Sequence, residues 1–447
     1  MKPGLKPLIA LMTVALLAGS TGCTTDVTTP APTTPLPTTS SATGPDTPVV
    51  VWAVQSGQSD SYKAGVDRWN AANPDRPIVL RLIPDADYKS KIKVALDAGQ
   101  GPDLIFNWGG GGLKDYIAAG YIDPLDPYIS QYPTLLSKYL PSTMTPVLFG
   151  GLAYGVPIAN IQPVVVYYNK QVFDDAKAKP AATWDEMTDL VDTFNARGIA
   201  PFTVAGQSKW PYLPYLEYLV DRIGGPDVFN GIAANTPDSW SDPAVIKALT
   251  MIQSLVRADG FTPDFSSLKY ETGDADALLY TGKAAMLTML ASAYANINQA
   301  APEFVAAGNL AYTAFPTVKD GIGDVSDIVG NPSNYWSLNA KATASHKATA
   351  VQFLAEQVEN EQWAAEIIGR NGLPPTASAE SLLSAPGKEF AKYCFTLIKN
   401  AKNYQMSWDQ ALSAEQGSAL NTQLDLVFQL EITPQQFADQ MNKTIKA

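Results

Sequence analysis

The chain is poor in histidine and cysteine, the nitrogen and sulfur ligands of zinc. Its 447 residues include one histidine, His346, and two cysteines, Cys23 and Cys394. Zinc sites are built from Cys, His and acidic ligands, so this sequence has almost nothing from which to make one. Cys394 lies in an apolar helical pattern, which predicts a buried, unreactive thiol. His346 stands where a helix is expected to begin, and we expect it to be solvated.

Positive charge is also scarce. The sequence has 31 Lys and Arg against 43 Asp and Glu, a formal net charge of −12, and it contains no run of basic residues. Nucleic acids and anionic lipid surfaces require clustered Lys and Arg, so neither is expected as the main partner. The hydrophobic fraction of 46% is ample for a packed core. The length suggests two or more domain-sized units.

The first apolar run, Leu8–Ala18, is shorter than the ~20 residues that a membrane-spanning helix needs. It follows two lysines and precedes small residues, an order typical of an export signal. Cys23 directly after Ser20-Thr21-Gly22 resembles a bacterial lipobox, although Ser20 stands where leucine is usual. We expect residues 1–22 to be a lipoprotein signal peptide and Cys23 to be lipidated. The protein would then be exported and anchored to the outer face of the cytoplasmic membrane. An ordinary secretory signal is the alternative.

The segment after Cys23 cannot form a packed core. In residues 24–48, Thr and Pro make up 16 of 25 positions, and no hydrophobic periodicity is visible. Such a segment favours extended polyproline II, with a reach of roughly 75 Å when fully stretched. We expect residues 23–48 to be a tether and the folded part to start near Pro48.

Strand and helix patterns alternate from Pro48 onward. The apolar runs Pro48–Val54, Ile78–Ile83 and Leu104–Phe106 have strand length, and amphipathic helical patterns separate them. This alternation predicts an α/β fold with a mostly parallel sheet between helices. Ligands of such sheets bind at loops after the carboxyl ends of strands. We therefore expect the loops Gln55–Asp60 and Asn107–Gly112 to face one crevice.

The glycine-rich segments match no nucleotide-binding or catalytic motif. Gly109–Gly112 lacks the Gly-Lys-Ser/Thr ending of a phosphate loop, and Gly321-Ile-Gly323 lacks the third glycine of a dinucleotide fingerprint. Gly206-Gln-Ser208 lacks the final glycine of a nucleophile elbow. We expect no metal, no cofactor and no enzymatic activity. The four glycines at 109–112 instead suit a tight turn or a close backbone approach to a ligand. A glycosidase with two carboxylates across a cleft remains the enzymatic alternative.

Aromatic side chains stand beside small polar ones in four predicted loops. The four segments are Asn107-Trp108, Lys209-Trp210-Pro211-Tyr212, Asn334-Tyr335-Trp336 and Ser407-Trp408-Asp409. A pyranose presents apolar C–H faces that suit flat aromatic rings, and a rim of hydroxyls that suits Asn, Gln and Asp. One such pair is more often part of a core than of a site. Four of them on an acidic chain without catalytic motifs indicate a neutral carbohydrate ligand.

The order of motifs along the chain resembles that of a known family. The motifs are Gly99–Phe106, Gly151–Pro157, Tyr167–Lys170 with Phe173, Pro180–Glu186, Tyr280–Met286, Phe315-Pro316 and Gly372–Pro375. They cover nearly the whole chain from Pro48 onward. In this order they resemble the extracytoplasmic solute-binding lipoproteins of ATP-binding-cassette (ABC) sugar importers, the family 1 group that includes maltose-binding protein.

The resemblance implies a periplasmic-binding-protein fold. Two α/β lobes, each a mostly parallel sheet flanked by helices, would be joined by a multi-stranded hinge and would close on the ligand. Lobe 1 is expected at 49–158 plus about 313–360, and lobe 2 at 159–312 plus about 361–447. The implied partners are an oligosaccharide and the permease subunits of an ABC transporter. We expect a monomer that touches the membrane only through its lipid anchor and binds no nucleic acid.

The resemblance also implies which residues contact the sugar. They are Gln55, Ser56, Asp60, Asn107, Trp108, Asn160, Trp210, Tyr212, Tyr294, Asn334, Tyr335, Trp408 and Asp409. Trp108, Trp210 with Tyr212, and Trp408 correspond to stacking positions of the family, and Asn160 lies at the expected hinge. Where many members carry Gly-x-Trp after the Gly-Lys-Ala-Ala-Met segment, this chain has Leu290–Tyr294, so that stacking position is missing or moved to Tyr294.

This departure argues against a long maltodextrin-like ligand. The segments Asn107–Gly111 and Gly330–Trp336 look most like the subgroup that takes up plant-wall disaccharides such as xylobiose. Chitobiose, cellobiose and raffinose-type sugars stay open. A charged solute such as a polyamine or peptide is the least favoured ligand.

Overall fold

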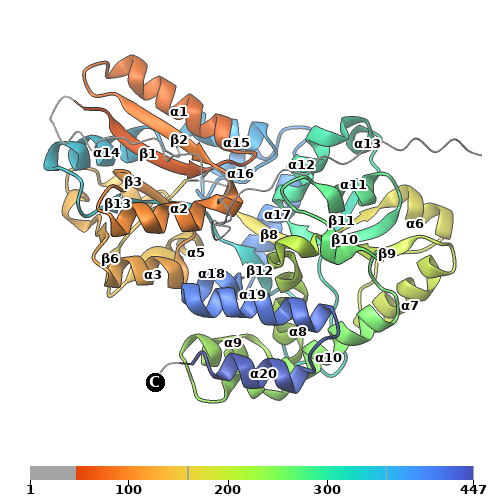
Figure 1. Ribbon diagram of the computed structural model, residues 1–447. Helices are drawn as coiled ribbons and strands as arrows, with labels where there is room; N and C mark the ends of the chain where they lie inside the picture. Colours follow the sequence, from red (N-terminus) through yellow and green to blue (C-terminus); the bar gives the residue numbers. More distant parts are fainter. Residues whose placement is uncertain (1–46, 159–160, 359, 446–447) are drawn as a thin grey trace, which may run out of the picture. The chain divides into compact units, whose positions relative to one another are not determined.

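The computed structural model describes residues 47–158, 161–358 and 360–445 (Figure 1). Several expectations concern residues outside the described ranges. They are the signal peptide, the lipidation of Cys23, all but the last two residues of the tether, and Asn160. Within the described ranges, no helix combines the length and the apolar character needed to cross a membrane.

The first sheet contains the strands expected at the start of the folded part. Its strand order is β2-β1-β3-β13-β4, and β7 also pairs with β13. The strands are β1 (Val49–Val54), β2 (Ile78–Ile83), β3 (Leu104–Asn107), β4 (Ile122–Asp123), β7 (Val156–Pro157) and β13 (Tyr335–Asn339). β1 runs parallel to β2 and β3, whereas β13 runs antiparallel to β3, β4 and β7.

The second sheet is built around β8. Its order is β14-β12-β8-β10-β9, with β11 also paired to β8. The strands are β8 (Gln162–Asn169), β9 (Ala200–Thr203), β10 (Ala284–Leu290), β11 (Leu310–Thr313), β12 (Ile328–Asn331) and β14 (Tyr404–Met406). β8 is antiparallel to β10, β11 and β12, while β9 pairs in parallel with β10 and β14 with β12.

Both sheets are therefore mixed, and the α/β class is confirmed while the mostly parallel arrangement is not. The chain reaches β8 directly from β7 of the first sheet, and it reaches β13 directly from β12 of the second sheet, with no helix among the described residues in between. Parallel neighbours in one sheet need a long crossover connection, whereas antiparallel neighbours do not. Both strands therefore run antiparallel to their neighbours.

Helices cover both sheets (Figure 1). Those packed with the first sheet include α1 (Ser59–Ala72), α2 (Asp85–Asp97), α3 (Gly110–Ala118), α4 (Thr134–Ser137), α5 (Pro141–Met144), α14 (Ala344–Glu356) and α15 (Glu361–Gly369). The others are α6 (Lys170–Ala176), α7 (Trp184–Asn195), α8 (Leu213–Gly224), α9 (Pro226–Ala233), α10 (Pro243–Arg257), α11 (Asp274–Tyr280), α12 (Ser292–Ala300), α13 (Pro302–Ala306), α16 (Ala379–Leu382), α17 (Glu389–Asn400), α18 (Trp408–Ala411), α19 (Ala414–Phe428) and α20 (Pro434–Asn442). A two-stranded hairpin, β5 (Leu148–Phe149) with β6 (Leu152–Ala153), stands apart from the two sheets.

Two hydrophobic cores accompany the two sheets. One draws its buried residues from 49–158 and 335–367, and the other from 161–329 and 368–441. We propose these two sets as the two lobes. The chain then returns to the first lobe after Asn331 rather than near residue 313, because β11 and β12 both pair with the second sheet. The last passage follows Ile367, later than residue 360, because α15 packs in the first core.

His346 is buried, contrary to the expectation of a solvated side chain. Its Nδ1 lies 3.0 Å from Oδ1 of Asp103, and its Nε2 lies 3.2 Å from Oγ1 of Thr47. The second oxygen of Asp103 accepts a hydrogen bond from the Val50 backbone N–H at 2.8 Å. The helix start therefore packs onto the first strand. Cys394 is buried as expected, and burial raises the pKa of its thiol.

Candidate functional site

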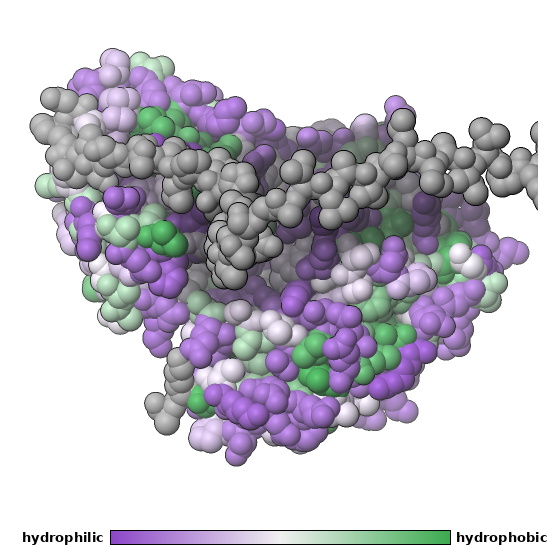
Figure 2. Space-filling model, viewed as in Figure 1, coloured by the Kyte–Doolittle hydropathy of each residue, from purple (hydrophilic) through white to green (hydrophobic). Residues whose placement is uncertain are grey.

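A cleft of about 1380 Å³ is lined by residues of both cores. From the first core come the ends of β1, β2 and β3, including Gln55, Asp85 and Trp108. From the second come the loop that ends in Trp210 and the segment around Tyr270. Much of the face of the molecule seen in Figure 2 is hydrophilic. The sequence predicted a ligand site at the carboxyl ends of the first parallel strands. The residues that the first core contributes to the cleft lie at these strand ends.

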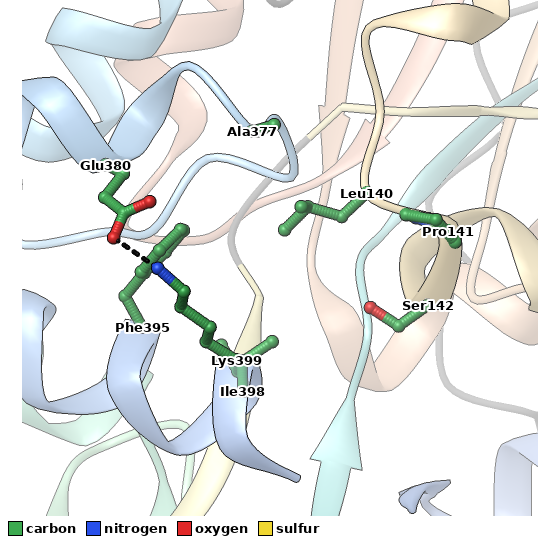
Figure 3. A pocket seen from close by; sticks show the side chains of 8 residues that line it. All are labelled: Leu140, Pro141, Ser142, Ala377, Glu380, Phe395, Ile398 and Lys399. Atoms are coloured by element: carbon green, nitrogen blue, oxygen red, sulfur yellow. Dashed lines mark hydrogen bonds and ion pairs between the residues drawn. The ribbon is translucent and has the colours of Figure 1, made fainter. Parts of the chain in front are cut away.

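A smaller pocket differs in chemistry. It measures about 210 Å³ and lies between α5 and α17 (Figure 3). Its walls include Leu140, Phe395 and Ile398, and the ammonium of Lys399 is paired with Glu380 at 2.8 Å. Because its charged groups are paired with each other and its walls are apolar, it offers little to a ligand rich in hydroxyls. The large cleft is therefore the candidate site.

Tryptophan side chains stand on both sides of the cleft. Trp108 is half-buried, and its orientation is fixed by edge-to-face contacts with Phe106 at 5.3 Å and Tyr88 at 5.8 Å. The ammonium of Lys89 lies 5.0 Å from the Trp108 ring centroid. On the other side, Trp210 meets the Tyr270 ring edge-on, with centroids 4.7 Å apart. Rigid aromatic surfaces of this kind suit the apolar face of a sugar ring.

Amide side chains line the cleft with unused hydrogen-bonding capacity. The side-chain oxygens of Asn331, Asn334, Gln410 and Asn421 are buried and have no hydrogen-bond partner among the described residues. Leaving a buried acceptor unpaired costs about 1–3 kcal/mol, so these oxygens do not stabilise the fold. A ligand that donates several hydrogen bonds would satisfy them.

Carboxylates reach the cleft from both cores. Burial raises the pKa of Asp85. The nearby Lys89 lowers this pKa, and the carboxylates of Glu271 and Asp409 raise it further. Burial also raises the pKa of Asp276 to about 7. The cleft therefore combines acceptors of two kinds, amide oxygens and carboxylates. In the described part of the chain, no group of three or more His, Cys, Asp or Glu side chains is placed to hold a metal ion.

A further carboxyl lies directly behind the cleft wall. Oε1 of Glu217 accepts hydrogen bonds from the hydroxyl of Ser407 at 2.8 Å and from the Trp408 backbone N–H at 2.7 Å. Burial raises the pKa of Glu217 to about 8, against the effect of these two hydrogen bonds. This carboxyl holds in place the segment whose Ser407 and Asp409 line the cleft.

The glycine run at 109–112 opens α3 and lies against the opposite core. A Cβ built on Gly110 would come 2.4 Å from the carbonyl oxygen of Gln410, and one built on Gly111 would come 2.0 Å from that of Leu412. The Ala414 backbone N–H donates to Asp115 of α3 at 3.1 Å. A glycine run of this kind suits either a tight turn or a close backbone approach to a ligand. The structure shows a close approach, but to the backbone of α18 and the residues that follow it.

Six of the residues expected to contact the sugar line the cleft: Gln55, Ser56, Trp108, Trp210, Asn334 and Asp409. Their contact with a ligand stays a prediction. The other described ones do not line it, and the expectation for them is corrected.

Two of the corrected residues belong to the first sheet. Asn107 is buried, and its amide donates to the Ser337 hydroxyl at 2.8 Å while its oxygen accepts from the Gly109 N–H at 2.9 Å. Tyr335, opposite Asn107 in the β3–β13 pair, is buried and donates to the Thr143 carbonyl at 2.7 Å. Side chains alternate between the two faces of a strand, so a residue beside a cleft residue points away from the cleft.

The remaining corrections concern residues engaged with the second core or with an ion pair. Tyr212, Trp408 and Tyr294 stack on Phe428, Phe229 and Phe390 at ring-centroid distances of 4.0, 4.6 and 4.2 Å. Asp60 lies in the first turn of α1 and pairs with Arg370 at 3.2 Å. Of the six aromatic side chains in the four predicted aromatic–polar loops, four are in a core and two, Trp108 and Trp210, line the cleft.

Sequence reasoning missed several cleft residues. Asp85 follows β2 directly, so the strand-end rule that selected Gln55 could have found it. Tyr270 stands between Lys269 and Glu271, so the aromatic–polar criterion that selected Trp210 could have found it. Asp276 and Asn296 follow no predicted strand, so the sequence carries no signal for them. These two reach the cleft because α11 and α12 pack beside β10.

Comparison with known proteins gives one family. The family model described as "Bacterial extracellular solute-binding protein" matches residues 55–362, more than half of the chain. The chain is also 28% identical over 179 residues to the maltotriose-binding protein of Pyrococcus abyssi, a match that covers 40% of this chain and 36% of that protein. The chain spans about half the length of the curated relatives it matches, or less.

Solved structures match over nearly the whole described chain. One, from work on xylan utilization by the thermophilic bacterium Caldanaerobius polysaccharolyticus, is 26% identical with a TM-score of 0.79, and the match covers 90% of this chain and 100% of that one. A chitin oligosaccharide binding protein is 23% identical with a TM-score of 0.80, covering 90% of this chain and 98% of that one. The second likeness shows the shared fold.

Proposed function

The chain belongs to the bacterial extracellular solute-binding protein family, and we propose that it captures a neutral di- or oligosaccharide. The capture takes place outside the cytoplasmic membrane, and the sugar is delivered to an ABC import permease. It is a binding protein and not an enzyme. The observation that carries the sugar assignment is the cleft itself. Trp108 and Trp210 offer apolar ring surfaces from opposite sides, and four unpaired amide oxygens offer acceptors for hydroxyl groups.

Within that class we propose xylobiose or a short xylo-oligosaccharide. The likeness to the structure from work on xylan utilization supports this choice, as does the order of motifs around Trp108 and Asn334. Chitobiose, cellobiose and raffinose-type sugars are the alternatives. Tyr294 packs on Phe390 and leaves the cleft without the extra stacking residue that a longer glucan would use.

The carboxylates of the cleft favour a second candidate, a polyamine or other cationic solute. The carboxylates of Glu271 and Asp409 both add to the rise in the pKa of Asp85 that burial causes, and among the described residues Lys89 is the one cation that lowers it. A cationic ligand would relieve this mutual repulsion, whereas a neutral sugar would use the carboxylates as hydroxyl acceptors. A glycosidase is the least favoured alternative.

A thermal-shift screen on the folded protein tests these candidates together. The panel contains xylo-, cello-, chito- and malto-oligosaccharides, raffinose and a linear polyamine. A ligand present at 100 times its Kd stabilises the protein by about 2.7 kcal/mol, so only a true ligand raises the melting temperature. A shift with the polyamine alone would overturn the sugar assignment. Chromatography of the bound sugar after long incubation, showing it uncleaved, excludes the glycosidase.

We also propose that the protein is held at the membrane through Cys23 and that residues 24–48 serve as its tether. A capture protein confined near its permease keeps the captured solute at a high effective concentration there. This supports the anchor proposed from the lipobox-like sequence.

A further inference from the structure

One carboxyl of the cleft has no partner of its own. Asp276 lies in α11 and lines the cleft, yet only 7% of its surface is exposed. Among the described residues it makes no hydrogen bond and no ion pair, and burial is the only influence on its pKa. Buried carboxyls are normally paired, because removing a charged or polar group from water without compensation is unfavourable.

The neighbouring carboxyl in the same helix shows the contrast. Asp274 also lines the cleft, but its oxygens accept hydrogen bonds from the Lys269 backbone N–H at 2.9 Å and from the Thr272 hydroxyl at 2.8 Å. These hydrogen bonds hold the pKa of Asp274 below its usual range. Asp274 therefore has a structural role in ordering the start of α11, whereas nothing in the described chain uses the carboxyl of Asp276.

The groups around Asp276 leave its charge uncompensated. The strands β9 and β10 that pack against α11 contribute no titratable side chain. Among the described residues, Asp276 acts on two phenols, Tyr167 of β8 and Tyr270 of the preceding loop, and α12, which packs against α11, adds a third, Tyr294. Burial raises the pKa of all three, that of Tyr270 to about 12, so they stay neutral near pH 7. On α11 itself the other titratable side chains are Asp274 and Tyr280. Asp85 acts on Tyr270 from the other side of the cleft.

We propose that Asp276 is a ligand subsite whose ionised carboxylate accepts hydrogen bonds from two neighbouring hydroxyl groups of the bound sugar. This rests on the proposed function. A carboxylate has two oxygens and no hydrogen to donate, so an unsubstituted vicinal diol is the ligand group that fits it. Hydrogen bonds to a charged acceptor are about twice as strong as neutral ones, which makes this subsite selective for a sugar with both hydroxyls free.

The subsite makes capture depend on pH. In the empty protein, burial raises the pKa of Asp276 to about 7. Two donated hydrogen bonds favour the ionised form, so the sugar lowers this pKa and binding expels a proton at and below pH 7. Affinity is therefore full above about pH 8 and falls as the pH drops through 7, by up to about tenfold per unit. A neutral sugar bound only by amides and aromatics would show no such dependence.

Titration calorimetry with the best sugar of the screen tests this inference. Wild type, Asp276→Asn and the control Asp174→Asn, an exposed carboxylate of α6 outside the cleft, are compared from pH 5.5 to 8.5. Each is measured in two buffers of different ionisation enthalpy that report proton release. We expect wild type and Asp174→Asn to weaken below pH 7 and to release up to one proton. Asp276→Asn should bind about tenfold to a hundredfold more weakly at pH 8, without pH dependence between 6 and 8.

Two further outcomes separate the inference from the function it rests on. A sugar that binds wild type with a pH-independent affinity, or that binds Asp276→Asn equally well, overturns the subsite and leaves the proposed function standing. If no sugar of the panel binds, the proposed function fails and the subsite fails with it. Should Asp276→Asn fail to fold, Asp276→Ala takes its place, because proton release by wild type alone does not separate Asp276 from Asp85, whose pKa is also raised. A deoxy or O-methyl analogue that loses affinity for wild type but not for Asp276→Asn identifies the diol.

Discussion

Gly111 lies directly against the carbonyl oxygen of Leu412, so close that a Cβ on this glycine would stand 2.0 Å from that oxygen. Gly111 belongs to α3, which packs in the first core, whereas Leu412 follows α18 and packs in the second. Backbone therefore meets backbone at this point between the two proposed lobes. The contact needs a residue without a side chain on the α3 side.

This contact predicts that Gly111→Ala weakens ligand binding. The added methyl must push α18 away from α3, which opposes the approach of the two lobes around the ligand, and we expect at least a tenfold loss of affinity by calorimetry. Gly112→Ala is the matched control, because a Cβ there meets nothing within 4 Å. Equal affinities in the two variants would show that the contact plays no part in closure.

The aromatic walls predict a loss of binding without a loss of fold. Trp108→Ala and Trp210→Ala should each weaken sugar binding by about 1 kcal/mol or more, because stacking rings at a binding site contribute on that scale. Both side chains are half-buried at the cleft, so the melting temperature of the empty protein should change little. Unchanged affinity in both variants would exclude these two rings as sugar contacts.

Tyr212 provides a test of the corrected assignment. The family resemblance makes it a sugar contact, but the structure stacks its ring on Phe428, and its buried hydroxyl has no partner among the described residues. Tyr212→Phe should therefore keep full affinity and the same or a slightly higher melting temperature. Tyr212→Ala should lower the free energy of unfolding by about 3–5 kcal/mol, as removal of a buried aromatic does. Weaker sugar binding by the phenylalanine variant would restore the original assignment.

Glu217 predicts how stability depends on pH. Its folded-state pKa of about 8 lies above the ordinary value of 4.5. A raised pKa means that the folded state holds the proton more tightly, so this contribution is complete below pH 4.5 and is lost as the pH rises through 8. Glu217→Gln keeps the oxygen that accepts from Ser407 and Trp408 but cannot ionise. The amount by which its melting temperature exceeds that of wild type should grow from about pH 5 to pH 8 and level off above about pH 9. A difference that stays constant from pH 5 to 9 would contradict the buried-acid interpretation.

Cys23 predicts where the protein is found in the cell. Cys23→Ser removes the thiol that a lipid chain would modify, so the exported protein should appear in the medium or in the soluble extracytoplasmic fraction. Wild type should fractionate with membranes and incorporate labelled palmitate. If wild type and variant fractionate alike, the tether proposal is wrong and the segment acts as an ordinary secretory signal.

The sequence predicted the parts of the fold that depend on local pattern. The strands β1, β2 and β3 follow from apolar runs of strand length, a signal that acts within a few residues. The direction of β8 did not follow, because antiparallel pairing with β10, β11 and β12 is decided by partners more than a hundred residues away.

The residues of the candidate site also fall into those that local sequence predicts and those that distant contacts place. Gln55 and Trp108 were found because each follows a strand that ends at the cleft. Asn107 was misplaced because a shift of one residue along a strand reverses the direction of the side chain. Asp276 had no signal at all, since its position in the cleft depends on the packing of one helix against a distant strand.

The meeting of α3 with the residues after α18 has a consequence for how this protein can vary. Because carbonyl oxygens and glycines form the contact, no exchange of one side chain for another can adjust its fit. Substitution there can only separate the two surfaces, whereas the sugar-facing positions can be altered one at a time. Substitutions in the cleft can therefore change which sugar the protein binds, whereas substitutions at the contact between α3 and the residues after α18 are tolerated poorly.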